Sequence, residues 1–111
     1  MKGFDEYQEL ARRTQAEGLS REERLNHAVF GLSSEAGEVA GILQKVYQGH
    51  EPDRDHLIKE LGDCLWMIAE ACDALTIPMG QVAQINIDKL RARYPDGFDT
   101  DHSLHRKDGD I

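Results

Sequence analysis

The sequence predicts an all-α protein, a four-helix bundle-like chain that works as an oligomer. Apolar residues recur at helical spacing along most of the chain, and no stretch shows a convincing strand pattern. Glycine, proline and capping residues divide this pattern into four helical stretches. We expect a single domain over residues 1–98 and a polar tail over residues 99–111.

The first predicted helix spans about residues 4–17. Phe4, Tyr7, Leu10 and Ala11 lie at the spacing of one helical face, and Gly18 ends the helix. The second helix opens at Ser20 with a capping box, in which Ser20 and Glu23 bond each other's backbone amides.

The second helix carries three internal glycines. Its apolar stripe runs from Leu25 to Val46, and Gly49 and Pro52 mark its end. Each internal glycine costs about 1 kcal/mol relative to alanine. We therefore expect a close helix approach or a ligand beside them. The glycines are Gly31, Gly37 and Gly41.

The third helix begins near Asp53 or Asp55 and ends near Leu75. Pro78 can start the fourth helix, which stops near Tyr94 because the next residue is a proline. Cys64 and Cys72 lie eight residues apart on the third helix, too far to pair, so we expect reduced thiols.

Composition excludes several classes of partner. Apolar residues make up 40% of the 111 residues, charged residues make up 31%, and the formal net charge is -8. A negative field disfavours generic attraction to nucleic acid or anionic membranes. No apolar run approaches the roughly 20 residues that span a bilayer, and the N-terminus shows no signal-peptide pattern. We expect a cytoplasmic protein with neither nucleic acid nor membrane as a partner.

Two carboxylate pairs stand out, one on each of the two long helices. Glu35 and Glu38 form an i, i+3 pair, and so do Glu60 and Asp63. On a helical wheel the first pair lies about 80° and 140° to one side of its apolar stripe. The second pair lies about 60° and 120° to the same side of its own stripe. If the helices pack through these stripes, the four carboxylates can meet.

Clustered carboxylates repel one another unless cations neutralise them. Their hard oxygen ligands favour Mg²⁺, with Mn²⁺ as a substitute, over Zn²⁺. The alternative is that these are ordinary solvated acids on helix flanks. A di-iron bundle would need Glu-x-x-His, and neither pair ends in histidine.

The chain resembles the MazG-like branch of the all-alpha NTP pyrophosphatase superfamily. The resemblance covers about residues 7–98. It rests on Gly31-Leu-Ser-Ser-Glu-Ala-Gly-Glu-Val39, Lys59-Glu-Leu-Gly-Asp-Cys-Leu-Trp66, Asn86-Ile-Asp-Lys-Leu90 and Arg93-Tyr-Pro-Asp-Gly-Phe98.

That resemblance implies Mg²⁺-dependent cleavage of NTPs or dNTPs to the monophosphate and pyrophosphate, a nucleotide-pool house-cleaning activity. It implies metal ligation by all four acids and catalysis by Glu35 and Glu38. Some members have an acid where this chain has Ser34, so their metal count does not transfer. The residues that it implies for substrate binding are Lys45, Lys59, Asn86, Lys89, Arg93 and Tyr94.

Two other functions stay open, namely phosphoribosyl-ATP pyrophosphohydrolase and a non-catalytic helical interaction module. We also expect a homodimer or homotetramer. The third helix's main apolar stripe runs from Leu57 to Leu75 through Leu61, Cys64, Leu65, Ile68, Ala71 and Cys72. Trp66, Met67 and Ala74 lie outside this stripe, so that helix is apolar over most of its circumference. A second copy of the chain would cover such a surface.

Overall fold

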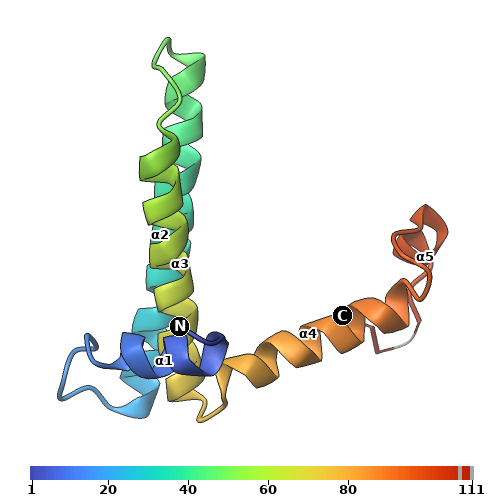
Figure 1. The fold of residues 1–111 in the computed structure, drawn as a ribbon, viewed down its shortest axis with the longest axis horizontal. Coiled ribbons are helices and arrows are strands. Elements are labelled where there is room, and N and C mark those ends of the chain that lie inside the picture. The colour runs from blue at the N-terminus through green and yellow to red at the C-terminus, as the bar shows by residue number, and fades with distance from the viewer. Residues whose placement is uncertain (108, 111) are drawn as a thin grey trace. The chain divides into compact units, whose positions relative to one another are not determined.

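The computed structural model describes residues 1–107 and 109–110, which divide into two compact units. The first unit is Met1–Met79 and the second is Gly80–Ile111. In the described residues, all regular secondary structure is helical apart from one isolated β-bridge between Pro95 and Gly97, so the predicted all-α class is confirmed. The helices are α1 (Phe4–Arg12), α2 (Arg21–Tyr47), α3 (Arg54–Ala74), α4 (Met79–Arg93) and α5 (Thr100–Leu104) (Figure 1).

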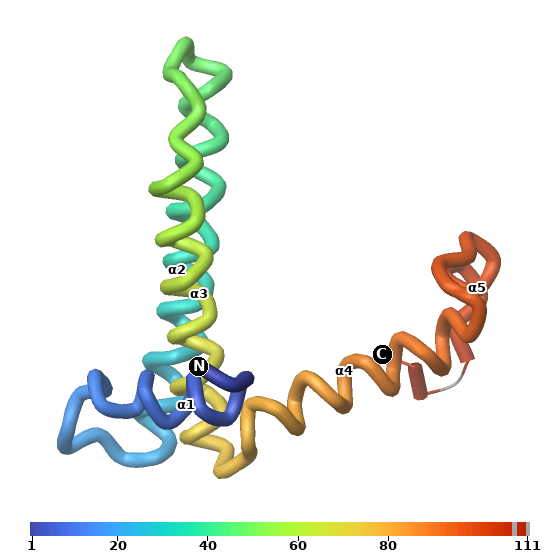
Figure 2. Tube along the Cα trace, in the orientation of Figure 1, coloured from blue at the N-terminus to red at the C-terminus, as the bar shows by residue number. Residues whose placement is uncertain are grey.

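The first unit is built on a hairpin of α2 and α3, which run side by side over most of their length (Figure 2). The predicted capping box starts α2: the Glu23 amide donates to Ser20 Oγ at 3.1 Å, and the Ser20 amide donates to the Glu23 carboxylate at 2.9 Å. Asp53 caps α3 by accepting from the His56 amide. Each cap satisfies a donor that the first helical turn leaves unpaired.

One of the three α2 glycines meets its neighbour. A Cβ at Gly31 would overlap the thioether of Met67 on α3, so this glycine lets that side chain lie against the α2 backbone. Gly37 and Gly41 face open space in the described chain. The expected close approach is therefore confirmed at Gly31 and not at the other two positions.

Helix α1 packs against α3 through a network centred on Asp73. The Asp73 carboxylate accepts from Arg12 Nη2 at 2.7 Å, Gln8 Nε2 at 2.8 Å and Gln15 Nε2 at 2.6 Å. Buried Gln8 also accepts from the Met79 amide at 2.7 Å. A small core of Ala11, Ala69, Cys72 and Met79 lies beside this network.

The prediction that the first helix extends to residue 17 is wrong, because α1 ends at Arg12. The next three residues, 13–15, keep only turn-type i→i−3 backbone hydrogen bonds, and side chains in this segment make further contacts. Thr14 Oγ1 donates to the Ala11 carbonyl and accepts from Trp66 Nε1 at 2.7 Å. Arg24 donates to the Ala16 carbonyl at 2.9 Å.

The residues expected to face a second chain from α3 pack within this one. Trp66 lies against the core beside α1, Met67 lies against Gly31, and Ala74 is buried. The exposed large apolar side chains on α3 include Leu61 and Leu65 from its predicted main stripe, and Ile58 outside that stripe. The stripe expected to form the intrachain core is thus partly open, although Ile68 and Cys72 from it contribute to the core beside α1.

A buried carboxylate lies on the α2–α3 contact. Glu70 is fully buried, accepts from His27 Nδ1 and has Arg24 Nη1 at 3.6 Å. A buried charge needs such partners to be tolerated. His27 makes this pair from α2 with its own side chain half exposed.

In the second unit, α5 falls within the segment predicted as a polar tail. The Asp99 carboxylate caps it by accepting from the Asp101 amide at 2.7 Å and the His102 amide at 3.3 Å. No helix in the described part of the chain is long and apolar enough to cross a membrane. Cys64 and Cys72 are both free thiols, as expected.

We predict that Asp73→Asn destabilises the first unit by about 1–2 kcal/mol, or roughly 5–10 °C in Tm, because it removes a charge-assisted network. Burial opposes ionisation of Asp73, but its three hydrogen-bond donors outweigh burial and hold its pKa below the ordinary value. A carboxylate with a lowered pKa stabilises the fold above its unfolded-state pKa, and this contribution is lost as pH falls through the folded-state pKa. Wild type and variant should therefore differ at neutral pH and converge in acid.

Thermal melts followed by circular dichroism across that pH range measure the difference. Asp101→Asn, which makes the same chemical change at an exposed position, is the control and should shift stability by less than about 0.5 kcal/mol. Equal melting of wild type and Asp73→Asn at neutral pH would show that the network contributes nothing.

Candidate metal centre

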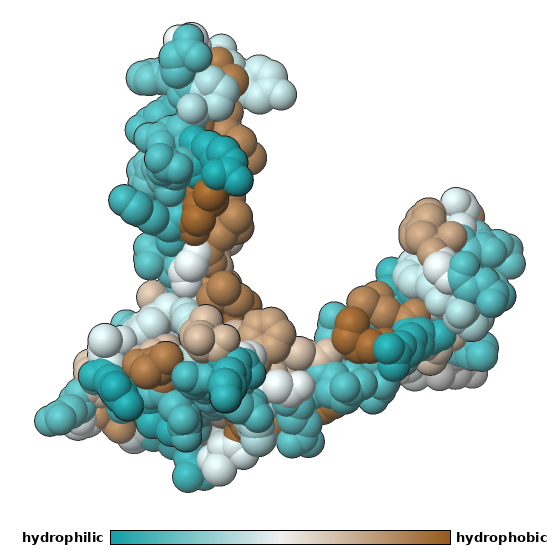
Figure 3. Space-filling model, viewed as in Figure 1, coloured by the Kyte–Doolittle hydropathy of each residue, from teal (hydrophilic) through white to brown (hydrophobic). Residues whose placement is uncertain are grey.

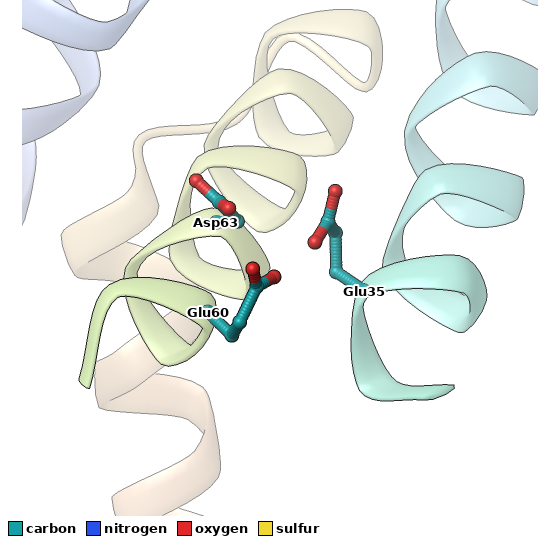
Figure 4. Close-up of side chains that lie close together, drawn as sticks. All are labelled: Glu35, Glu60 and Asp63. Carbon is teal, nitrogen blue, oxygen red and sulfur yellow. The ribbon is translucent and has the colours of Figure 1, made fainter. Parts of the chain in front are cut away.

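Three carboxylates converge where α2 faces α3. Glu35 projects from α2 toward Glu60 and Asp63 on α3 (Figure 4). One oxygen of each carboxylate lies within 4.8 Å of one oxygen of the other two. The i, i+3 spacing puts both α3 acids on one side of that helix, as the wheel predicts.

The electrostatics of the cluster are those of mutual repulsion. The pKa of Glu35 is raised, first by its hydrogen bond with Glu60, then by burial and by the charges of Glu60, Asp63 and Glu38. The Glu60 side chain is mostly buried, and its Oε2 has no hydrogen-bond partner among the described residues. A buried carboxylate oxygen without a donor is costly unless a cation meets it.

The residues present fit a hard divalent cation. All three side chains offer oxygen, the ligand that Mg²⁺ and Mn²⁺ prefer, and they come from two rigid helices. Mg²⁺ is commonly held by a few carboxylates and completed by water or substrate phosphates. The unpartnered Oε2 of Glu60 is the observation that favours a cation over a simple surface patch.

The fourth predicted ligand, Glu38, is exposed and lies outside the group of three. It is close enough for its charge to contribute to the raised pKa of Glu35. Its part in metal binding stays a prediction.

Two nearby side chains were missed from sequence. His56 Nε2 lies 3.2 Å from Glu60 Oε1, and its position four residues before Glu60 on one helix was the available signal. Tyr7 of α1 has its pKa raised by burial and by the charge of Asp63. The position of Tyr7 depends on how α1 packs, which the sequence pattern does not reveal.

The residues predicted to bind substrate divide between the two units. Lys45 and Lys59 are exposed in the first unit. The helical rise places Lys45 about 15 Å from Glu35 along α2. The others belong to the second unit, namely Asn86, Lys89, Arg93 and Tyr94. Asn86 and Lys89 are exposed, whereas Arg93 is paired with Asp110 and lies 5.8 Å from the Tyr94 ring centre.

A family model described as the MazG nucleotide pyrophosphohydrolase domain matches residues 23–98. The chain belongs to the MazG family. The match contains both acid pairs and the predicted substrate-binding residues of α4. The Gene 37 protein of Mycobacterium phage L5 is 34% identical over 76 residues, covering 64% of this chain and 67% of the phage protein. No solved structure gives a significant match.

We predict that this MazG chain binds Mn²⁺ and that Glu60→Gln or Asp63→Asn weakens binding by roughly tenfold or more, about 1.4 kcal/mol. Without metal, either variant should melt at the same temperature as wild type or higher, because one repelling charge is gone. With metal, wild type alone should gain clear stability, since only the folded site binds.

Calorimetric titration and melts with and without Mn²⁺ supply both readouts. Glu51→Gln changes an exposed acid in the loop between α2 and α3 and should behave as wild type. Unchanged Mn²⁺ affinity in Glu60→Gln would place the metal elsewhere.

Proposed function

We propose that the chain hydrolyses NTPs or dNTPs to the monophosphate and pyrophosphate, with Mg²⁺ held by Glu35, Glu38, Glu60 and Asp63. Mn²⁺ should substitute. The observation that carries this proposal is the convergence of Glu35, Glu60 and Asp63 from two helices around an unpartnered carboxylate oxygen. It lies inside a region that matches a nucleotide pyrophosphohydrolase family.

The bound cation would supply positive charge against the phosphates and lower the pKa of water. The chain's own residues then have two tasks. Glu35 reaches the cluster from α2, opposite both α3 acids, so we assign it to orient and deprotonate the attacking water, with Glu38 assisting from the same helix. Lys89 and Arg93 are assigned to the phosphates, with Asn86 and Tyr94 on the sugar or base and with Lys45 and Lys59 as further cations.

A panel of NTPs, dNTPs and phosphoribosyl-ATP tests the reaction. With Mg²⁺, at least one nucleotide should yield its monophosphate and pyrophosphate, and EDTA should abolish the yield. Glu60→Gln should lower kcat by roughly 100-fold, about 2.7 kcal/mol, while Glu51→Gln should not. Products can be identified by ³¹P NMR. Full turnover in excess EDTA would eliminate the metal mechanism, and release of phosphate with a nucleoside diphosphate would eliminate the proposed bond cleavage.

We also propose that the protein works in the cytoplasm as a homodimer or homotetramer. Large apolar side chains are exposed along the hairpin, and Figure 3 shows apolar surface along it. Phe30 is 71% exposed and Tyr47 is 94% exposed. The others on α2 and α3 include Val29, Leu43, Val46, Ile58, Leu61 and Leu65. Two such hairpins packed together would make the four-helix bundle that α2 and α3 half supply.

Light scattering at micromolar concentration should give at least twice the 12.5 kDa chain mass. Leu65→Lys should lower the mass by placing a charge in the interface. Leu104→Lys, at an exposed position in α5, should not. A monomer with full activity would refute the proposal.

A further inference from the structure

An ion pair in the second unit joins a predicted phosphate-binding residue to a carboxylate. Arg93 Nε donates to Asp110 Oδ2 at 2.8 Å, and Arg93 Nη2 donates to Asp110 Oδ1 at 2.6 Å. The arginine side chain is 9% exposed and the aspartate side chain 15%. Arginine binds phosphate with the same two-pronged geometry, so one guanidinium edge cannot serve both partners at once.

Other cations surround the same carboxylate. The hydrogen bond from Arg93 holds the pKa of Asp110 below its ordinary value, and the charges of Arg93, Arg106 and Lys89 add to this effect. A cavity of about 310 Å³ lies beside the pair, lined by Lys89, Ala92, Lys107, Gly109 and Asp110. Its volume is at the lower end of the range for small-ligand sites. Three cations, Arg93, Arg106 and Lys89, thus act electrostatically on this one carboxylate.

We propose that Asp110 occupies the position of a phosphate group, so that a di- or triphosphate must displace this carboxylate from Arg93 before it can bind Arg93 and Lys89 together. Asp110 is then an intramolecular competitor that lowers affinity for the phosphate chain. This inference rests on the proposed function, which assigns those two cations to phosphate. Beyond that assignment, the anion site would be filled by Asp110 of the same chain whenever no ligand is bound.

The fraction of molecules in which Arg93 is released from Asp110 decides whether a variant binds an anion more or less tightly. When only a fraction of molecules has Arg93 released, the apparent Kd for an anion rises by the inverse of that fraction. Asp110→Asn removes the negative charge and weakens the pair, which raises the released fraction. A purely structural ion pair predicts the opposite, because its loss would loosen the site and weaken binding.

The probe is inorganic pyrophosphate, titrated calorimetrically in EDTA so that no metal at the acid cluster contributes. Asp110→Asn should bind it tighter than wild type by roughly fivefold or more. Asp110→Glu, which keeps the charge, should stay near wild type. Asp101→Asn makes the same charge change on an exposed side chain of α5 and should leave affinity unchanged.

Equal or weaker binding of pyrophosphate by Asp110→Asn would overturn the proposal, and so would an equal gain in Asp101→Asn. The gain must also disappear in the Arg93→Ala background, because the competition is for that side chain. Nucleotide hydrolysis is scored separately. If the protein hydrolyses nucleotides but Asp110→Asn does not bind pyrophosphate more tightly, only the role of Asp110 as a competitor is refuted. If Asp110→Asn binds pyrophosphate more tightly but no nucleotide is hydrolysed, the anion site is supported and the proposed function is refuted.

Discussion

The contact between α2 and α3 is the interaction on which the candidate site depends, because it brings carboxylates from separate helices together. This contact holds two carboxylate sites that differ in whether basic side chains neutralise them. In one, buried Glu70 has Arg24 and His27 as partners from its own chain. In the other, Glu35, Glu60 and Asp63 converge, and within the described residues no lysine or arginine pairs with them. The chain neutralises the first site itself, and the second has the charge and ligands to take a cation from solution.

Packing within the hairpin also leaves apolar surface of α2 and α3 uncovered. Helix α1 covers the flank of α3 that carries Trp66, while apolar side chains elsewhere on both long helices face outward. Gly37 and Gly41 also face open space, although glycine inside a helix is costly. A second hairpin packed on these surfaces would account for both observations. Metal binding and association would then be properties of the same two helices.

The sequence predicted the helices and the acid cluster for the same reason, namely that both follow from helical periodicity. Capping residues placed the starts of α2 and α3 correctly, and i, i+3 spacing placed Glu60 and Asp63 on one side. Periodicity could not say which flank α1 would cover, so the side of α3 expected at an interface proved internal. Nor could it foresee the end of α1 at Arg12, just before the segment in which Thr14 accepts from Trp66 of α3. The Arg93–Asp110 pair also has no signature at a separation of seventeen residues.

The central claim is that the converging acids form a cation site. Anomalous diffraction from a crystal grown with Mn²⁺ tests it most directly, because it locates the metal without reference to activity. We expect an anomalous peak bound by Glu35, Glu60 and Asp63, with metal–oxygen distances of about 2.0–2.4 Å. A peak at another position would contradict the cation site. So would the absence of a peak in a crystal where a basic side chain or an ordered water donates to Glu60 Oε2.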